Sequence, residues 1–501
     1  MREASGTPGA SRNGGVHAMR RQAKAASRAA AHAVGSAIEH AVSSHHRRRL
    51  RKVGWEHAFD ASELGFSSGA TFSPHSGNKV DVLIDGAAYL PLLAEEIASA
   101  KSHVHLLGWC FSPELHLTRE EEPVVLRNLL SDVARRIDVR LLVWEGAAVP
   151  VFRPTKRDVR SYLEVFTRST GIQAETDSCV RLKYSHHEKT VVIDDRVAFV
   201  GGIDLTLDGG DPFDTPKHHS HGKQGWHDAA VRIEGPAVAD VADHFRLRWR
   251  GPGEERLPPP LESAPKGDVE LQVVRTIPER VFDSLPRGDF SVFESYTRAL
   301  RSAERLVYLE NQFLWSPEIV AILVDKLRDP PSDDFRVLAV LPAHPNDGAD
   351  VSRGAVSTLI HADDGNERFL ACTLYARTGP LRDLVYVHSK IGIVDDRWLT
   401  IGSANLNERS MFNDSEVNIV TLDEELARDT RLRLWEEHLE TSDVDGDPTR
   451  VIDELWRPTA GSQLAHLQAG RPLEHRLVAL PGVSRRARRI AGVVQARVYD
   501  G

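Results

Sequence analysis

Short apolar runs alternate along this chain with longer segments in which apolar residues recur at helical spacing. In the first half, apolar runs at residues 80–84, 103–107 and 139–144 alternate with helical patterns at 89–100 and 124–135. Such runs, rich in Val, Leu and Ile, are typical of strands buried on both faces. The second half repeats this order as helix 292–303, strand 306–309, helix 318–328 and strand 335–341. The alternation predicts an α/β fold, and its repetition predicts an internal duplication.

Composition divides the chain into five segments. Residues 1–52 are rich in Ala, Arg and His and predict a basic tail, either attracted to an anionic membrane or simply solvated. The two copies of the α/β unit are expected at residues 53–250 and 269–440. Between them, residues 251–268 contain three consecutive prolines and predict a linker. Residues 441–501 predict a polar C-terminal extension with a basic end, which would be a solvated helix face or a membrane contact.

One short pattern, His-x-Lys-x4-Asp, occurs once in each copy. The first instance is His187, Lys189 and Asp194, and the second is His388, Lys390 and Asp395. Side chains alternate between the faces of a strand, so each His and its Lys should point the same way. The two aspartates have the opposite parity, and we expect them to face away and to hold a turn or neighbouring backbone.

Two His-Lys pairs suit the displacement of a group on phosphorus. A lysine ammonium can bind non-bridging phosphate oxygens and neutralise charge that develops there without a metal. A neutral imidazole can attack phosphorus, and a protonated imidazole can donate to a departing alkoxide. With one His from each half, the reaction would pass through a covalent phosphohistidine.

Charge and composition limit the possible partners. The net charge of −9 gives no general attraction to nucleic acid, so no nucleic-acid partner is expected. The three cysteines lie far apart, which suggests neither a zinc site nor disulfides. No apolar run is long enough to cross a bilayer, and the N-terminus lacks the apolar core of a signal peptide. We expect a cytoplasmic monomer without a cofactor, with a peripheral contact to phospholipid at the inner membrane face as its partner surface.

Three histidines, His218, His219 and His221, lie close together in one loop, as metal ligands often do. The loop is polar and contains glycine, but it has no carboxylates at ligand spacing. The sequence therefore predicts no metal.

The duplicated pattern resembles the signature of the phospholipase D superfamily. Blocks that flank it also match: residues 309–313 precede the second signature, and residues 402–411 follow it. In the first half, Gly201-Gly202-Ile203-Asp204 and Trp226-His227-Asp228 match as well. These blocks resemble phospholipases D of the eukaryotic type more than the nucleases. The resemblance spans about residues 80 to 440 and implies two pseudo-symmetric αβα sandwich lobes with the active site at their interface.

The resemblance also implies roles for single residues. His187 would be the nucleophile, and His388 the general acid and then the base for the incoming water or alcohol. Lys189, Lys390 and Asn405 would hold phosphate oxygens. Asp204 stands where many relatives carry Asn, which removes an expected hydrogen-bond donor. The residues placed at the phosphate or beside the imidazoles are Asp204, Asn405 and Ser403, with Asp214 and Glu416 orienting the two rings through their second nitrogens.

The function implied by the resemblance is that of a phosphodiesterase or phosphatidyltransferase. It would cleave the distal phosphodiester bond of glycerophospholipids and give phosphatidic acid and an alcohol, or a lipid with a new headgroup. A cardiolipin synthase-type transferase is an alternative, although such enzymes usually carry N-terminal membrane spans. A nuclease is disfavoured by the negative net charge, and a non-catalytic lipid-binding scaffold by the two intact His-Lys pairs.

Overall fold

The computed structural model describes residues 39–147, 154–177, 185–208, 210–218, 225–249, 256–343, 349–376 and 383–481. Most of the predicted basic tail, the basic C-terminal end, His219 and His221 lie outside these residues. No helix in the described ranges is long and apolar enough to cross a membrane.

The first half follows the predicted alternation of strands and helices. Its elements are β1 (His75–Ile84), α2 (Gly86–Ser99), β2 (His103–Gly108), α3 (Leu126–Val133), β3 (Asp138–Trp144), α4 (Lys156–Thr167), β4 (Gln173–Asp177), β5 (Thr190–Ile193), β6 (Val197–Gly201), β7 (Trp226–His227), β8 (Ala229–Glu234) and α5 (Val238–Arg248).

The second half repeats this order and then continues. Its elements are β9 (Val269–Ile277), β10 (Asp289–Phe290), α6 (Ser291–Ser302), β11 (Leu306–Asn311), α7 (Pro317–Arg328), β12 (Arg336–Val340), α8 (Ala349–Asp363), β13 (Phe369–Leu374), β14 (Tyr386–Val387), β15 (Lys390–Val394), β16 (Trp398–Gly402), α9 (Glu408–Phe412), β17 (Glu416–Thr421), α10 (Glu424–Leu439), α11 (Pro448–Val451), the π-helical turn η2 (Ile452–Trp456), α12 (Arg457–Gln468) and β18 (Leu477–Ala479).

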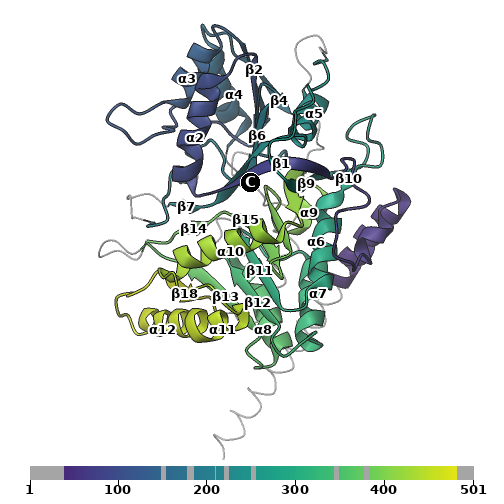
Figure 1. The fold of residues 1–501 in the computed structure, drawn as a ribbon, viewed down its shortest axis with the longest axis vertical. Coiled ribbons are helices and arrows are strands. Elements are labelled where there is room, and N and C mark those ends of the chain that lie inside the picture. The colour runs from purple at the N-terminus through teal and green to yellow at the C-terminus, as the bar shows by residue number, and fades with distance from the viewer. Residues whose placement is uncertain are drawn as a thin grey trace, which may run out of the picture.

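The strands show that the two halves are copies of one unit. Outward from the centre, the first half runs β1-β8-β6-β5-β2-β3-β4, and the second runs β9-β17-β16-β15-β11-β12-β13. The outer three strands of each half are parallel, and the inner ones are antiparallel. At the centre, β1 pairs with β9, so the two sheets join into one. The predicted α/β duplication is confirmed. The strands of the two copies form the two halves of one continuous sheet instead of two separate sheets (Figure 1).

Helices cover both faces of the sheet because its central strands are apolar on both sides. Every residue of β5 and β6 is buried. Val191 and Ile193 point into a core with α2, α3 and α4, whereas Val192 points to the opposite face and packs with α5. Burial of one such side chain stabilises the fold by about 1.5–3 kcal/mol. The same core that contains Val192 continues into β15, β17 and α10, so the halves share a core.

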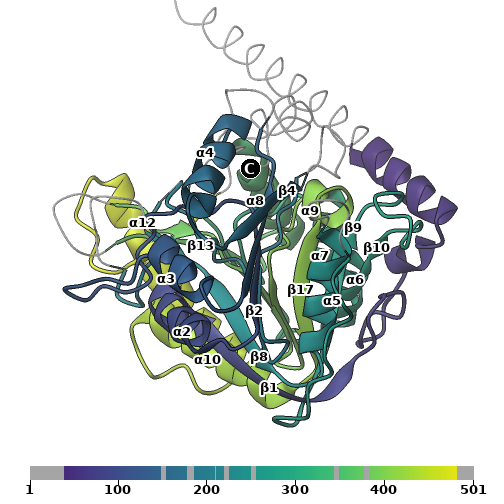
Figure 2. The same ribbon diagram turned by 90° about the horizontal axis from the view of Figure 1, so that it is seen from above.

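The residues on both sides of the boundary predicted at residue 52 pack against the second half. Residues 39–52 are helical, and Leu50 is fully buried in a core formed by α6, α7 and α8. In the short helix η1 (Glu56–Phe59) and just before it, Phe59 and Trp55 pack against Phe293 and Phe290 of the second half. Both views place this N-terminal helix beside the second half and away from α2 and α3 (Figure 2).

The described residues beyond the boundary predicted at residue 440 also pack against the second half. Strand β18 pairs antiparallel with β13 and extends the sheet of the second half. Trp456 is fully buried and packs edge-on against Trp435 of α10. The segment up to residue 481 therefore belongs to the second half, although its sequence is polar on average.

Candidate active site

Each His-Lys stretch lies against the other half of the molecule. The backbone N–H of His187 donates to the carbonyl of Ser415 at 3.1 Å, and that of His388 donates to the carbonyl of His227 at 2.8 Å. Just before His388, β14 pairs in parallel with β7. Figure 1 shows β7 and β14 where the two halves meet. The two signatures are thus brought together between the halves.

Both signature histidines and Lys390 have lowered pKa values. Burial lowers the pKa of His187 well below its usual value, and the charges of Lys189 and Lys390 act in the same direction. Burial likewise lowers the pKa of His388, helped by both lysines and by His187. Burial also lowers the pKa of Lys390 to about 7. A neutral imidazole keeps a nitrogen lone pair, which a nucleophile requires.

Glu416 holds the ring of His187. Both of its carboxylate oxygens lie 3.1 Å from His187 Nδ1. The hydroxyls of Ser403 and Ser410 donate to the same carboxylate at 2.5 and 2.6 Å. Ser403 Oγ also accepts the backbone N–H of Val417 at 3.1 Å. Burial raises the pKa of Glu416 to about 8, while these two hydroxyl donors favour its ionised form.

Asp228 holds the ring of His388. Its Oδ2 lies 2.6 Å from His388 Nδ1, and its Oδ1 accepts the backbone N–H of Ala229 at 2.8 Å. Burial raises the pKa of Asp228 to about 7. The indole of Trp226 stacks on the imidazole of His388, with ring centroids 4.5 Å apart. The imidazole of each signature histidine is therefore held by an acid from the other half.

The structure places Asp214 away from both catalytic rings. Its carboxylate bonds to His218 Nδ1 at 3.0 Å and to the backbone N–H of Thr215. The role expected for Asp214 beside an imidazole is taken by Asp228, because β7 carries Asp228 to the edge of β14. The contact expected for Glu416 is present.

The two lysines are buried and point back toward their histidines. Lys189 Nζ donates to the carbonyl of His187 at 2.8 Å, and Lys390 Nζ donates to the carbonyl of His388. Asp204 Oδ2 lies 3.7 Å from Lys189 Nζ. Burial raises the pKa of Asp204, whose Oδ1 accepts the backbone N–H of Leu205. Asp204 thus lies beside Lys189, where its carboxylate can accept a hydrogen bond but cannot donate one as an amide would.

Asn405 and Ser403 occupy different positions in the second half. Asn405 Nδ2 donates to Gln312 Oε1 at 3.3 Å, and its Oδ1 is buried without a hydrogen-bond partner among the described residues. Ser403 bonds to Glu416 and so orients the carboxylate that holds His187. We therefore place Ser403 with the orienting residues.

The two aspartates that end the signatures bind backbone, as their parity predicts. Asp194 accepts the backbone N–H groups of residues 101, 102 and 103 at 2.7–3.1 Å. Asp395 accepts those of residues 304, 305 and 306 at 2.7–2.8 Å. Both sit in hairpin turns with φ of 57° and 53°, where Asp is tolerated. Neither touches the catalytic rings in these contacts, so their place in the signature reflects structure.

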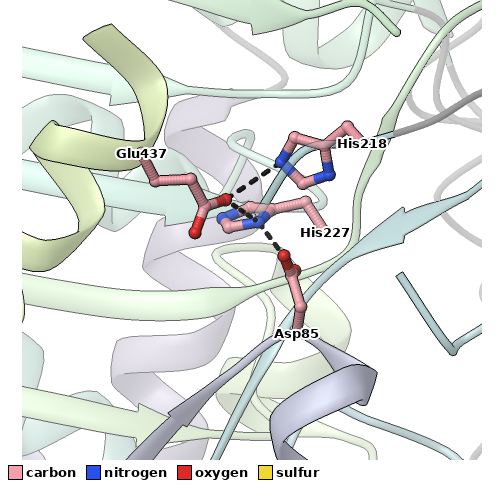
Figure 3. Close-up of side chains that lie close together, drawn as sticks. All are labelled: Asp85, His218, His227 and Glu437. Atoms are coloured by element: carbon pink, nitrogen blue, oxygen red, sulfur yellow. Dashed lines mark hydrogen bonds and ion pairs between the residues drawn. The ribbon is translucent and has the colours of Figure 1, made fainter. Parts of the chain in front are cut away.

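Histidines outside the signatures gather in buried clusters with carboxylates. His186 lies between Asp177 and Glu188 and faces away from His187. In the described part of the chain, the groups with metal-ligand spacing are Asp85, His218, His227 and Glu437, and separately His227, Glu310 and His438 (Figure 3). Neither group includes a signature residue.

Sequence reasoning missed Asp228, Ser410 and Trp226 as members of the site. All three stand in blocks that match the family, Trp226-His227-Asp228 and residues 402–411, but no local pattern distinguishes an orienting acid from a structural one. What the site offers is two neutral imidazoles with fixed Nδ1 partners and two lysines that can bind an anionic oxygen.

Comparison with known proteins relates this chain to phospholipase D and cardiolipin synthase. A family model described as phospholipase D matches residues 96–222, and one described as cardiolipin synthase, PLD-like domain, matches residues 296–436. Phospholipase D A of Dictyostelium discoideum is 27% identical over 72% of this chain and 35% of its own length. The major cardiolipin synthase ClsA of Bacillus subtilis is 26% identical over 70% of this chain and 67% of its own. The crystal structure of phosphatidylserine synthase from Haemophilus influenzae has a TM-score of 0.50 at 12% identity and covers 74% of this chain and 87% of that chain.

The fold and the site define a duplicated α/β protein in which two His-Lys pairs meet between the halves. The chain belongs to the phospholipase D superfamily. It spans only about a third of the length of its Dictyostelium and Schizosaccharomyces pombe relatives, at 35% and 39%.

Proposed function

We propose that this protein is a phospholipase D-type phosphodiesterase or phosphatidyltransferase that cleaves the distal phosphodiester bond of glycerophospholipids. The observation that carries the proposal is the pairing of His187 with Glu416 and of His388 with Asp228 across the halves. In this arrangement the two imidazoles would act on one phosphorus, one as nucleophile and the other as acid and base.

In the first step, His187 attacks phosphorus through Nε2, and the bond to the headgroup oxygen breaks. Glu416 accepts the Nδ1–H of His187 and stabilises the positive charge that the ring gains. His388 donates a proton to the leaving alkoxide. Asp228 can return a proton to His388 Nδ1, because burial raises the pKa of that carboxyl to about 7.

In the second step, His388 takes a proton from water or from an alcohol, and the resulting oxygen attacks the phosphohistidine. Water gives phosphatidic acid, and an alcohol gives a lipid with a new headgroup. Lys189, Lys390 and Asn405 would hold the non-bridging oxygens in both steps. The matches to several eukaryotic phospholipases D support this branch of the superfamily. The proposed partner is the surface of a phospholipid membrane, contacted peripherally.

A cardiolipin synthase-type transferase is the second candidate. The match of residues 296–436 to the cardiolipin synthase model and the likeness to ClsA favour it. The chemistry at phosphorus would be the same, but the acceptor alcohol would be the headgroup of a second phospholipid.

The deciding experiment supplies phosphatidylcholine, phosphatidylglycerol and single-stranded DNA separately in EDTA, with and without a short alcohol. Release of choline with phosphatidic acid, or a transphosphatidylated lipid when alcohol is present, supports the first proposal. Conversion of phosphatidylglycerol to cardiolipin and glycerol alone would favour the second. Cleavage of DNA without any lipid turnover would refute both. His187→Ala should abolish turnover, and phosphate label trapped on His388 would reverse the assigned roles.

A further inference from the structure

Four buried side chains from four separate segments converge next to the His388–Asp228 pair. Asp85 follows β1, His218 lies in a loop, His227 ends β7, and Glu437 belongs to α10 (Figure 3). Glu437 Oε1 lies 2.9 Å from His218 Nε2 and 3.3 Å from His227 Nδ1, and Asp85 Oδ1 lies 3.0 Å from His227 Nδ1. These four atoms all fall within 4.8 Å of one another.

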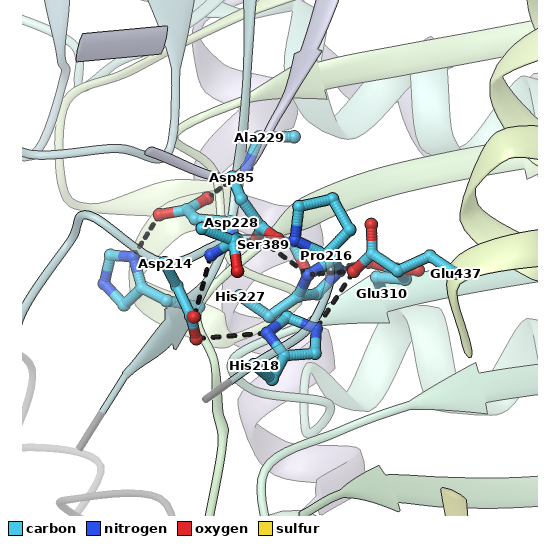
Figure 4. A network of polar contacts seen from close by, with 12 residues as sticks. Asp85, Asp214, Pro216, His218, His227, Asp228, Ala229, Glu310, Ser389 and Glu437 are labelled. Carbon is cyan, nitrogen blue, oxygen red and sulfur yellow. Dashed lines mark hydrogen bonds and ion pairs between the residues drawn. The ribbon is translucent and has the colours of Figure 1, made fainter. Parts of the chain in front are cut away.

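The outer nitrogen of each imidazole is also held by a carboxylate. His218 Nδ1 bonds to Asp214 at 3.0 Å, and His227 Nε2 bonds to Glu310 at 2.8 Å (Figure 4). Histidines that bind metals show this arrangement, because the outer carboxylate fixes the ring and its tautomer so that the inner nitrogen presents its lone pair. The outer contact expected of such a ligand is present for both rings.

One oxygen of the cluster has no partner. Asp85 is fully buried, and its Oδ2 makes no hydrogen bond within the described residues. A buried carboxylate oxygen without a partner is costly unless a proton or a metal ion meets it.

We propose that Asp85, His218, His227 and Glu437 form a binding site for a Zn²⁺-like divalent ion that ties the first half to α10. Two imidazole nitrogens and two carboxylate oxygens match zinc, whereas Ca²⁺ and Mg²⁺ take oxygen ligands. Tetrahedral bonds of about 2.0–2.1 Å place neighbouring ligand atoms about 3.3 Å apart, close to the 2.9–3.3 Å contacts here. The role is structural, because the cluster contains neither catalytic histidine.

An ion bound in this cluster would also help to position His388 and Asp228. The carbonyl of His227 accepts the backbone N–H groups of His388 and Ser389, and Asp85 Oδ1 accepts the backbone N–H of Asp228 at 3.3 Å. The same residues that would bind the ion therefore position the His388–Asp228 pair. The alternative occupant is a proton on each inner nitrogen. Burial opposes it, but the surrounding carboxylates prevail and raise the pKa of His218 to about 9.

Metal content decides between the two occupants. The full chain would be purified through a tag without histidines, incubated with ZnSO₄, desalted, and analysed by elemental mass spectrometry and thermal unfolding. We expect about one tightly held zinc per chain and a Tm several degrees higher than after treatment with a strong chelator. His218→Gln and Glu437→Gln should each lose the zinc and the Tm response.

The matched control is His244→Gln, which changes another buried histidine that faces a carboxylate, Glu188, outside the cluster. It should keep the zinc. Less than about a tenth of an ion per chain in the wild type, with no Tm response to ZnSO₄, would overturn the proposal in favour of the protonated network. Zinc retained equally by both cluster variants would overturn it as well, because the ion would then lie elsewhere. Neither result depends on the lipid activity.

Discussion

Replacement of Glu416 by glutamine tests how the site prepares its nucleophile. The carboxylate contacts His187 Nδ1 at 3.1 Å and accepts the hydroxyls of Ser403 and Ser410. When His187 attacks phosphorus it becomes positively charged, and a neutral amide stabilises that charge less well. A hydrogen bond to a charged group contributes about 1.5–3 kcal/mol, and a factor of ten in rate corresponds to about 1.4 kcal/mol. Glu416→Gln should therefore slow formation of the phosphohistidine by about 10- to 150-fold.

The assay is a single-turnover reaction with a lipid labelled in its phosphate, quenched in alkali so that protein-bound label survives. Glu318→Gln is the matched control, since Glu318 is also buried but bonds to His46 and Ser316, away from both signatures. It should leave the rate unchanged. If Glu416→Gln forms the labelled protein within about threefold of the wild-type rate while keeping its unfolding midpoint, the orienting role is wrong.

Three further predictions concern Asp395, Asp228 and His388. Asp395→Ala removes the acceptor of three backbone N–H groups, so it should lower the free energy of unfolding in urea by about 2–3 kcal/mol with little change in kcat; a large loss of kcat in folded protein would contradict the structural role. Asp228 has a raised folded pKa, so the folded state binds more protons than the unfolded state between pH 4 and about 7 and loses stability as pH rises through that window. Asp228→Asn should remove up to about 4 kcal/mol of that loss in urea titrations at pH 4.5 and 7.5, and identical slopes would refute the shift. His388→Ala should slow release of choline by about 10²–10⁴-fold but release p-nitrophenol from a matching ester in a single burst, because that leaving group needs no acid; an equal loss on both substrates would argue against His388 as the acid.

Much of the fold follows from local pattern. Apolar runs such as β5 and β6 are buried on both faces, so they are recognisable without knowledge of their neighbours. The repeated order of elements then predicts the duplication. Trp55 and Trp456 show the limit of this reasoning. Each is one large apolar residue in a polar stretch, and each becomes part of a core only through contacts with α6 or α10.

In the candidate site, too, some features follow from local spacing and others depend on contacts between distant segments. Parity correctly separates the aspartates from the His-Lys pairs because it depends only on local spacing, although β5 begins at Thr190 and β15 at Lys390, so that each His lies just before its strand. The choice between Asp214 and Asp228 depends on the pairing of β7 with β14, segments that lie about 160 residues apart in the chain. The carboxylate neighbours of His218 are not predictable from local sequence for the same reason, since Asp85 and Glu437 come from distant segments.

Each signature imidazole contacts a carboxylate from the other half, and the two carboxylates differ in their surroundings. This difference explains how two copies of one signature can take different roles. His187 is held by a glutamate whose two oxygens already accept serine hydroxyls, and these donors oppose the burial that raises the pKa of this carboxyl to about 8. His388 is held by a shorter acid with one backbone donor and lies under the indole of Trp226. Because each imidazole depends on an acid from the other half, neither half contains a complete catalytic pair. The two signatures are alike, so a difference in role between His187 and His388 would come from the residues that surround them.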